Sequence, residues 1–192
     1  MMQALQQQIL DFWFGPPGSA EYGTTRDVWF RKDASFDADI RLRFGAAIDT
    51  ALAGGFADWT APRASLARVL VLDQFTRNCY RDSARAFAGD AQALATATAA
   101  VDQEQDRELI PVERWFLYMP FVHAESPVAQ SRSLALFTRL AHETGLTDPL
   151  VWAKKHADII RRFARYPHRN ASLGRASTAE EIAFLSTQGS NF

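Results

Sequence analysis

The feature that most limits the fold is the spacing of apolar residues, which recur three and four positions apart in segment after segment. Segment 3–14, for example, carries Leu5, Ile9, Phe12 and Trp13 on one side of a predicted helix. Alanine, the best helix former, is the commonest residue, whereas Val and Ile are sparse. The sequence therefore predicts an all-α chain of about eight antiparallel helices joined by short loops, as in a helical bundle or an α-solenoid.

Capping and helix-breaking residues place the ends of these helices. Asp33 or Ser35 is expected to cap a helix that ends at Gly54, and Pro62 lies in the first turn of a helix to about Arg77. In the loop before Asp33, Trp29 and Phe30 are expected to be buried. Further helices are expected over 90–103, from Pro111, over 127–145, over 148–166, and after a capping box of Ser177 with Glu180 or Thr178 with Glu181.

Length and charge narrow the class of protein. With 192 residues the chain is predicted to form a single domain over 1–192. Its 21 Lys and Arg and 22 Asp and Glu give a net charge of −1, so no overall positive field attracts nucleic acid or an anionic membrane. No apolar run is long enough to span a bilayer. A signal peptide begins with a basic region, whereas no basic residue precedes Arg26 here. A single cysteine, Cys79, fits a reducing compartment, and we expect a cytoplasmic protein.

One polar stripe runs along the mostly apolar helix that begins at Pro62. Asp73, Arg77 and Arg81 are four residues apart and share a face if the helix continues to Arg81, and Gln74 and Asn78 line the adjacent face. An intrahelical pair of Asp73 with Arg77 is one interpretation. The other is a binding site, because a guanidinium group binds a carboxylate or phosphate through two parallel hydrogen bonds.

A second polar group follows the apolar run that begins at Trp115 and contains Tyr118. His123 and Glu125 end this run. As metal ligands they are a weak signal, because no second histidine at helical spacing supports them. We predict no metal and no cofactor, and a histidine packed in the core remains an alternative to a functional His123.

The densest basic cluster lies near the C-terminus. Five arginines, one histidine and one asparagine occur within fifteen residues, namely Arg161, Arg162, Arg165, His168, Arg169, Asn170 and Arg175. Such density favours a small anionic ligand or the carboxylate of a peptide, with a solvated basic rim as the alternative. Nucleic acid is disfavoured, because no basic domain or stacking platform accompanies the cluster.

Several of these motifs together resemble one family. They are Ile9–Gly15, Trp29–Phe30, Leu72–Phe75 with Arg77, Asn78 and Arg81, Phe116–Phe121 with His123 and Glu125, and Pro167–Asn170 with Leu173–Arg175. Over about residues 8–186 the chain resembles the mainly bacterial domain of unknown function family 924. The resemblance implies a compact superhelix similar to tetratricopeptide-repeat proteins and implies no activity. Thr76, Cys79 and Ala124 depart from the family pattern, which argues against a catalytic Cys79.

Three hypotheses of function follow from these residues. The first is a ligand-binding helical domain whose site gathers Asp73, Gln74, Arg77, Asn78, Arg81, Tyr118, His123, Glu125, Arg165, His168, Arg169, Asn170 and Arg175 around a small anion or peptide carboxylate. The second is a hydrolase in which His123 or His168 works with a carboxylate. The third is a structural or protein-interaction module held together by buried ion pairs. A homodimer is compatible with each of them.

Overall fold

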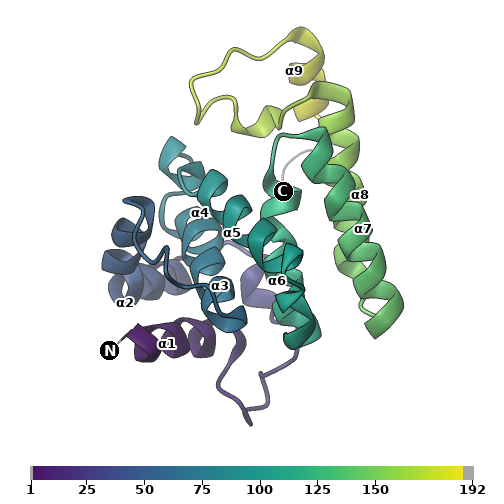
Figure 1. The fold of residues 1–192 in the computed structure, drawn as a ribbon. Coiled ribbons are helices and arrows are strands. Elements are labelled where there is room, and N and C mark those ends of the chain that lie inside the picture. Colours follow the sequence, from purple (N-terminus) through teal and green to yellow (C-terminus); the bar gives the residue numbers. More distant parts are fainter. Residues whose placement is uncertain (1, 188–192) are drawn as a thin grey trace.

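The computed structural model describes residues 2–187, and within this range the chain contains helices and loops without a strand (Figure 1). The α-helices are α1 (Met2–Phe14), α2 (Ala34–Leu52), α3 (Pro62–Val69), α4 (Thr76–Cys79), α5 (Asp90–Asp102), α6 (Pro111–His123), α7 (Pro127–Thr144), α8 (Asp148–Phe163) and α9 (Ala179–Leu185). Short 3-10 turns connect them: η1 (Asp27–Trp29), η3 (Ala84–Phe87), η4 (Gln105–Glu108) and η5 (Pro167–Arg169). The predicted all-α fold is confirmed.

Local side chains explain why the helices begin where they do. The Asp33 carboxylate accepts hydrogen bonds from the backbone N–H groups of Ser35 and Phe36 and so caps α2. Thr178 and Glu181 form the capping box of α9, which decides between the two pairs that the sequence allowed. These contacts satisfy backbone donors that a helix N-terminus otherwise leaves without partners.

Two expectations are wrong, one about the end of a helix and one about the burial of a loop residue. The helix predicted over 148–166 ends at Phe163, because Ala164 adopts a left-handed conformation with φ of 58°. Phe30 is 57% exposed, although its neighbour Trp29 is buried. Its ring stacks on Trp115 with centroids 5.1 Å apart, so Phe30 covers the core from outside.

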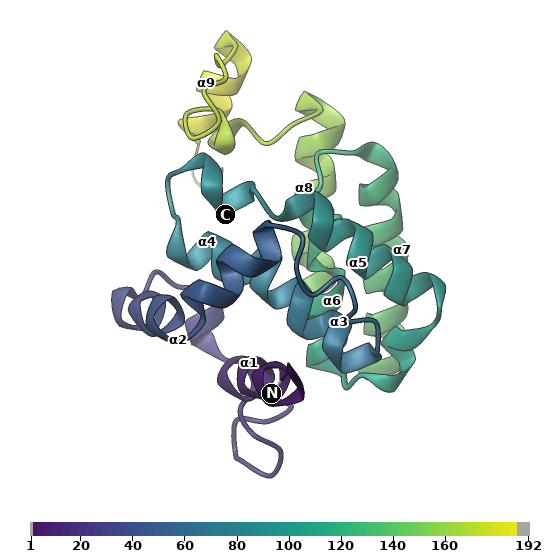
Figure 2. The ribbon, with the colours of Figure 1, turned by 60° about the vertical axis from the view of Figure 1, so that its left-hand side comes forward.

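One core is formed by residues of the helices from α1 to α8. A smaller apolar cluster lies under the segment from η5 to α9, which we call the C-terminal segment. Helices α6, α7 and α8 pack side by side, and the segment from η5 to α9 lies at one end of the molecule, beyond α4 (Figures 1 and 2). Ile159, Ile160 and Tyr166 form the smaller cluster with Phe163 and Phe184. No helix in the described range combines the length and the apolar character needed to cross a membrane.

The helix that begins at Pro62 contains a π-helical segment, η2 (Leu70–Phe75), between α3 and α4. All six residues of η2 are buried, including Asp73, which has no exposed surface. π-Helical turns inside α-helices are rare and often occur at functional sites. Gly89 packs closely on this segment, since a Cβ atom there would lie 2.2 Å from the Leu72 carbonyl oxygen. This close approach sets the start of α5, and with it Asp90, beside the π-helical segment.

Candidate functional site

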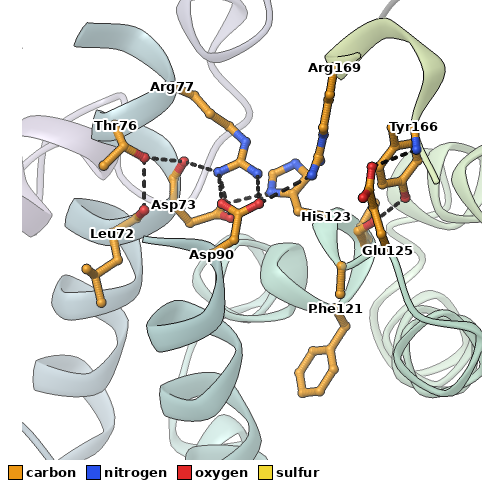
Figure 3. A network of polar contacts seen from close by, with 12 residues as sticks. Leu72, Asp73, Thr76, Arg77, Asp90, Phe121, His123, Glu125, Tyr166 and Arg169 are labelled. Atoms are coloured by element: carbon orange, nitrogen blue, oxygen red, sulfur yellow. Dashed lines mark hydrogen bonds and ion pairs between the residues drawn. The ribbon is translucent and has the colours of Figure 1, made fainter. Parts of the chain in front are cut away.

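Charged and titratable side chains from five elements meet where the C-terminal segment covers η2 and the start of α5 (Figure 3). We call this group the polar centre. It consists of Asp73 from η2, Arg77 from α4, Asp90 from α5, His123 from α6 and Arg169 from η5.

The most closely placed pair in the polar centre is Asp73 with His123. Nδ1 of His123 lies 2.7 Å from Oδ1 and 2.9 Å from Oδ2 of Asp73. Burial alone would raise the pKa of Asp73, but Arg77 and His123 hold the pKa of this carboxyl below its ordinary value. Burial, followed by Arg77, lowers the pKa of His123. At neutral pH, His123 is therefore a neutral imidazole that donates Nδ1–H to an ionised carboxylate, which leaves the Nε2 lone pair as a base.

Arg77 connects the two carboxylates of the polar centre. Its guanidinium donates two hydrogen bonds to Asp90, at 2.8 and 2.9 Å, and it lies 3.1 Å from Oδ1 of Asp73. It also donates to the Asp73 carbonyl oxygen at 2.8 Å. The sequence allowed an intrahelical pair of Asp73 with Arg77, and the structure contains it. Asp90, the second partner, comes from another helix.

Arg169 is the least satisfied charge of the centre. Its guanidinium lies between the rings of Phe87 and Tyr166, 4.7 and 4.5 Å from their centroids, and the residue is 6% exposed. Within residues 2–187, its only side-chain hydrogen bond goes to Asp90 at 3.3 Å, and its buried Nε has no acceptor. Burial, followed by the charge of Arg77, lowers the pKa of Arg169 to about 10. Most of its hydrogen-bonding capacity is therefore unused.

Three of the four histidines of the sequence lie near the polar centre. The rings of His123 and His156 are 6.4 Å apart, and Tyr166 lies 5.6 Å from both His156 and His168. Burial lowers the pKa of His156 to about 3 and that of His168 to about 4. These histidines are therefore neutral at pH 7, and the positive charge of the centre comes from its arginines.

Glu125 and Arg175 hold the C-terminal segment beside the polar centre. Arg175 binds the Glu125 carboxylate through two nitrogens, at 2.6 and 2.9 Å. Glu125 also accepts a hydrogen bond from the backbone N–H of Tyr166 at 2.8 Å. The Tyr166 hydroxyl donates to the Val122 carbonyl oxygen at the end of α6. These contacts fix the position of Tyr166, on which Arg169 stacks.

The structure divides the predicted site residues into separate groups. The polar centre and its immediate surroundings contain Asp73, Gln74, Arg77, His123, Glu125, His168, Arg169 and Arg175. Asn78 and Arg81 both bind Asp37 of α2, at 2.6 and 2.7 Å.

The remaining predicted residues have other partners. Arg165 and Asn170 both bind Glu181 of α9. Tyr118 lies in a different buried network, where its hydroxyl donates to Asp106 and accepts from Arg114 and Arg139. These three residues therefore fasten helices and loops outside the polar centre.

Asp90 and His156 belong to the site but were not predicted. Asp90 begins a predicted helix, and a position at a helix start already accounts for an aspartate in the sequence. Its role as the partner of Arg77 and Arg169 was therefore not predicted. His156 follows the apolar pattern of α8, so nothing in the local sequence marks it. Among residues 2–187 no group of three or more His, Cys, Asp or Glu side chains is arranged to hold a metal ion.

Comparisons with known proteins agree with this fold. The family model described as bacterial protein of unknown function (DUF924) matches residues 9–189. The chain is also similar to the solved structure of a protein of unknown function from Agrobacterium tumefaciens, with 37% sequence identity and a TM-score of 0.85. That match covers 97% of this chain and 99% of the other. No curated protein gives a match.

Proposed function

The chain belongs to the DUF924 family of bacterial proteins of unknown function, and we propose that its polar centre binds a small anion. The observation that carries the proposal is Arg169, a buried guanidinium that has one long hydrogen bond and an Nε without an acceptor in the described part of the chain. Leaving donors of a buried charged group without acceptors costs free energy. A carboxylate or phosphate would supply the missing acceptors.

The charges around Arg169 support an anion with few charges. Arg77 and Arg169 are balanced by Asp73 and Asp90, and the nearby histidines are neutral. A ligand therefore meets two guanidinium groups whose charge is already compensated by carboxylates. This balance disfavours a polyanion such as a nucleoside triphosphate. A carboxylate or a phosphate monoester fits this balance better.

The side chains that are still reachable from solvent indicate where the anion enters. Arg77, Asp90 and Arg175 keep 18%, 23% and 24% of their side-chain surface exposed, and His123 keeps 11%. An anion that enters among them reaches Arg77 first and Arg169 behind it.

A thermal-shift titration tests the proposal. We expect inorganic phosphate, phenyl phosphate or acetate to raise the melting temperature of the wild type. At one hundred times the dissociation constant, the gain is about 2.7 kcal/mol, or about 5 to 10 °C for a domain of this size. Arg169→Gln should remove the shift, because Gln cannot offer the paired donors of guanidinium.

Arg161→Gln is the matched control, because Arg161 lies on α8, is largely exposed and pairs only with Asp158 among the described residues. This variant should keep the full shift. Equal shifts in Arg169→Gln and the wild type would contradict binding at the polar centre. So would the absence of any shift with all three anions.

A second candidate function is acid–base catalysis, and the distance of 2.7 Å between His123 and Asp73 favours it. A buried carboxylate that fixes the tautomer of a histidine is the arrangement by which enzymes prepare a general base. In a hydrolysis, Nε2 of His123 would take a proton from the attacking water and return it to the alcohol oxygen as the ester bond breaks, while Arg77 stabilises the negative charge on the reacting ester. Turnover of a phosphate or carboxylate ester panel that is lost in His123→Gln and kept in His142→Gln would establish this function, whereas no turnover would count against it.

A further inference from the structure

A second place in the molecule combines a hollow with unused polar groups. A surface hollow of about 270 Å³ lies between α3 and α5. Its polar lining comes from Trp59, Thr60, Ser65, Arg68, Gln92, Thr96, Gln103 and Gln105. Alanines of α5, including Ala95 and Ala99, line the rest and leave the space open because their side chains are short. None of these residues belongs to the polar centre.

Arg68 is the charged group of this hollow. It forms no ion pair with any residue from 2 to 187, and its one side-chain hydrogen bond, to Oε1 of Gln92, is 3.5 Å long. Its Nε is buried and has no acceptor among these residues. Burial lowers the pKa of Arg68, and the charge of Asp58 offsets only part of this effect. A partly desolvated guanidinium without a carboxylate is the complement of a carboxylate ligand.

Two further lining residues have a polar atom without a partner. Among the described residues, Nε1 of Trp59, a residue that is 2% exposed, donates to no acceptor, and Oε1 of Gln105 accepts from no donor. The amide nitrogen of Gln105 donates a hydrogen bond to the Thr60 carbonyl oxygen at 2.9 Å, and this bond fixes the orientation of the amide. The hollow therefore has a cation with one long hydrogen bond, and just beneath its surface lie an N–H donor and an acceptor that no residue from 2 to 187 satisfies.

We infer that this hollow binds a small carboxylic acid that also carries a hydroxyl or ammonium group. The carboxylate is bound by Arg68 with the indole N–H of Trp59, and the hydroxyl or ammonium group donates to Oε1 of Gln105. Both atoms lie beneath the surface of the free protein, so binding requires the Trp59 ring to move against Phe56 and the Gln105 amide to give up its contact with the Thr60 carbonyl oxygen. The alanines of α5 contact the carbon atoms of the ligand.

Size and charge limit the ligand further. With about 30 Å³ for one water molecule, the hollow has the volume of about nine waters, which suits a molecule of about ten non-hydrogen atoms. Asp58 lies close enough to influence Arg68 and repels a second carboxylate. A monocarboxylate such as a polar amino acid or hydroxy acid therefore fits better than a dicarboxylate.

Nitrogen-15 NMR of the full chain tests this inference through the indole N–H of Trp59. The signal is identified by its loss in Trp59→Phe. L-threonine and L-glutamine, titrated into the millimolar range, should shift this signal in a saturable way. L-threoninol, which lacks the carboxylate, should not shift it, and butyrate, which lacks the donor groups, should bind about tenfold more weakly.

Arg68→Gln should weaken the binding of L-threonine by about tenfold or more, because it removes the charge that pairs with the carboxylate. Ala99→Leu fills the hollow from an exposed helix position and should abolish the shift without affecting folding. Arg161→Gln on α8 should leave the titration unchanged. The inference is overturned if neither amino acid shifts the signal, or if Arg68→Gln binds as tightly as the wild type.

Discussion

Nδ1 of His123 lies 2.7 Å from Oδ1 of Asp73, although the two residues are 50 positions apart and Asp73 has no exposed surface. The same carboxylate accepts a hydrogen bond from Gln74 at 2.6 Å and lies 3.1 Å from Arg77. A fully buried charge is tolerated only when such partners surround it. The pair thus joins α6 to the π-helical segment and fixes the ring of His123.

Replacing Asp73 by Asn tests how strongly the fold depends on this charge. The neutral amide no longer balances the charge of Arg77. Its NH₂ group is also a donor, and it would face groups that donate to the carboxylate in the wild type. We expect a loss of about 3 to 5 kcal/mol in the free energy of unfolding, measured by urea denaturation.

Asp102→Asn is the matched control, because Asp102 is 60% exposed and pairs with Arg132 at the surface. Its loss should stay below about 1 kcal/mol. A loss in Asp73→Asn as small as that of the control would show that the buried charge is dispensable. The polar centre would then not act as the joint between α6 and η2.

The backbone contact of Gly89 with Leu72 gives a second test. A Cβ at position 89 would lie 2.2 Å from the Leu72 carbonyl oxygen and 2.9 Å from its carbonyl carbon, so Gly89→Ala must push α5 away from η2. We expect a loss of about 1 to 3 kcal/mol in the free energy of unfolding. Because Asp90 follows directly, the shift also weakens its contact with Arg77.

Gly45→Ala offers the opposite expectation in the same protein. Gly45 lies inside α2, and a Cβ there meets no atom of its surroundings within 4 Å. Alanine should stabilise the helix by about 0.5 to 1 kcal/mol. If both variants were stabilised, the close packing of Gly89 on η2 would be refuted.

The sequence predicts the helices well because their signals are local. Asp33 caps α2 as expected, and Thr178 with Glu181 forms one of the two predicted capping boxes. The end of α8 is wrong by three residues, because the left-handed conformation of Ala164 has no signal in the sequence. The π-helical segment is likewise invisible, since its residues follow the same apolar pattern as the α-helix around it.

The polar centre is only partly predictable, because its partners come from distant elements. The spacing of Asp73 and Arg77 indicates one face of a helix, but it does not show that His123 reaches that face. The expected continuation of this face to Arg81 is wrong, because the helix ends at Cys79, and Arg81 binds Asp37 of α2 from the following turn. Sequence spacing predicts which residues share a face, and only packing determines which other helix that face meets.

Cys79 is expected to react slowly in the folded protein. It is 4% exposed, and burial raises the pKa of its thiol, so little thiolate is present at neutral pH. The rate of alkylation by iodoacetamide should be about one hundredfold lower than in the urea-unfolded chain. This ratio corresponds to a local opening of the folded chain around Cys79 that costs about 3 kcal/mol. The rate is measured by mass spectrometry of the intact chain.

The unfolded chain in urea is the internal control, since Cys79 is the single cysteine of the sequence. Equal rates in the folded and unfolded chain would contradict the burial of the thiol. Reagent would then reach Cys79 through the surface hollow that it lines together with Asp37, Arg41 and Arg81.

The buried histidines predict how stability depends on pH. Burial lowers the pKa of His156 to about 3 and that of His168 to about 4, whereas an unfolded histidine titrates near 6.5. Between these values the unfolded chain binds more protons than the folded chain, so the free energy of unfolding falls as the pH falls below about 6.5. For His156 alone the slope is up to about 1.4 kcal/mol per pH unit.

Urea unfolding at pH 7.5, 6.5, 5.5 and 5.0 measures this slope, in a range above the titration of most carboxylates. In His156→Gln the slope should decrease, because glutamine does not titrate, while its amide can still donate to the Trp152 carbonyl oxygen that His156 contacts at 2.8 Å. His142→Gln at the exposed end of α7 is the control for the same exchange at a surface histidine. A free energy of unfolding that stays constant from pH 7.5 to 5.0 would mean that the buried histidines accept protons without loss of packing, and the neutral state assigned to them around Tyr166 would be wrong.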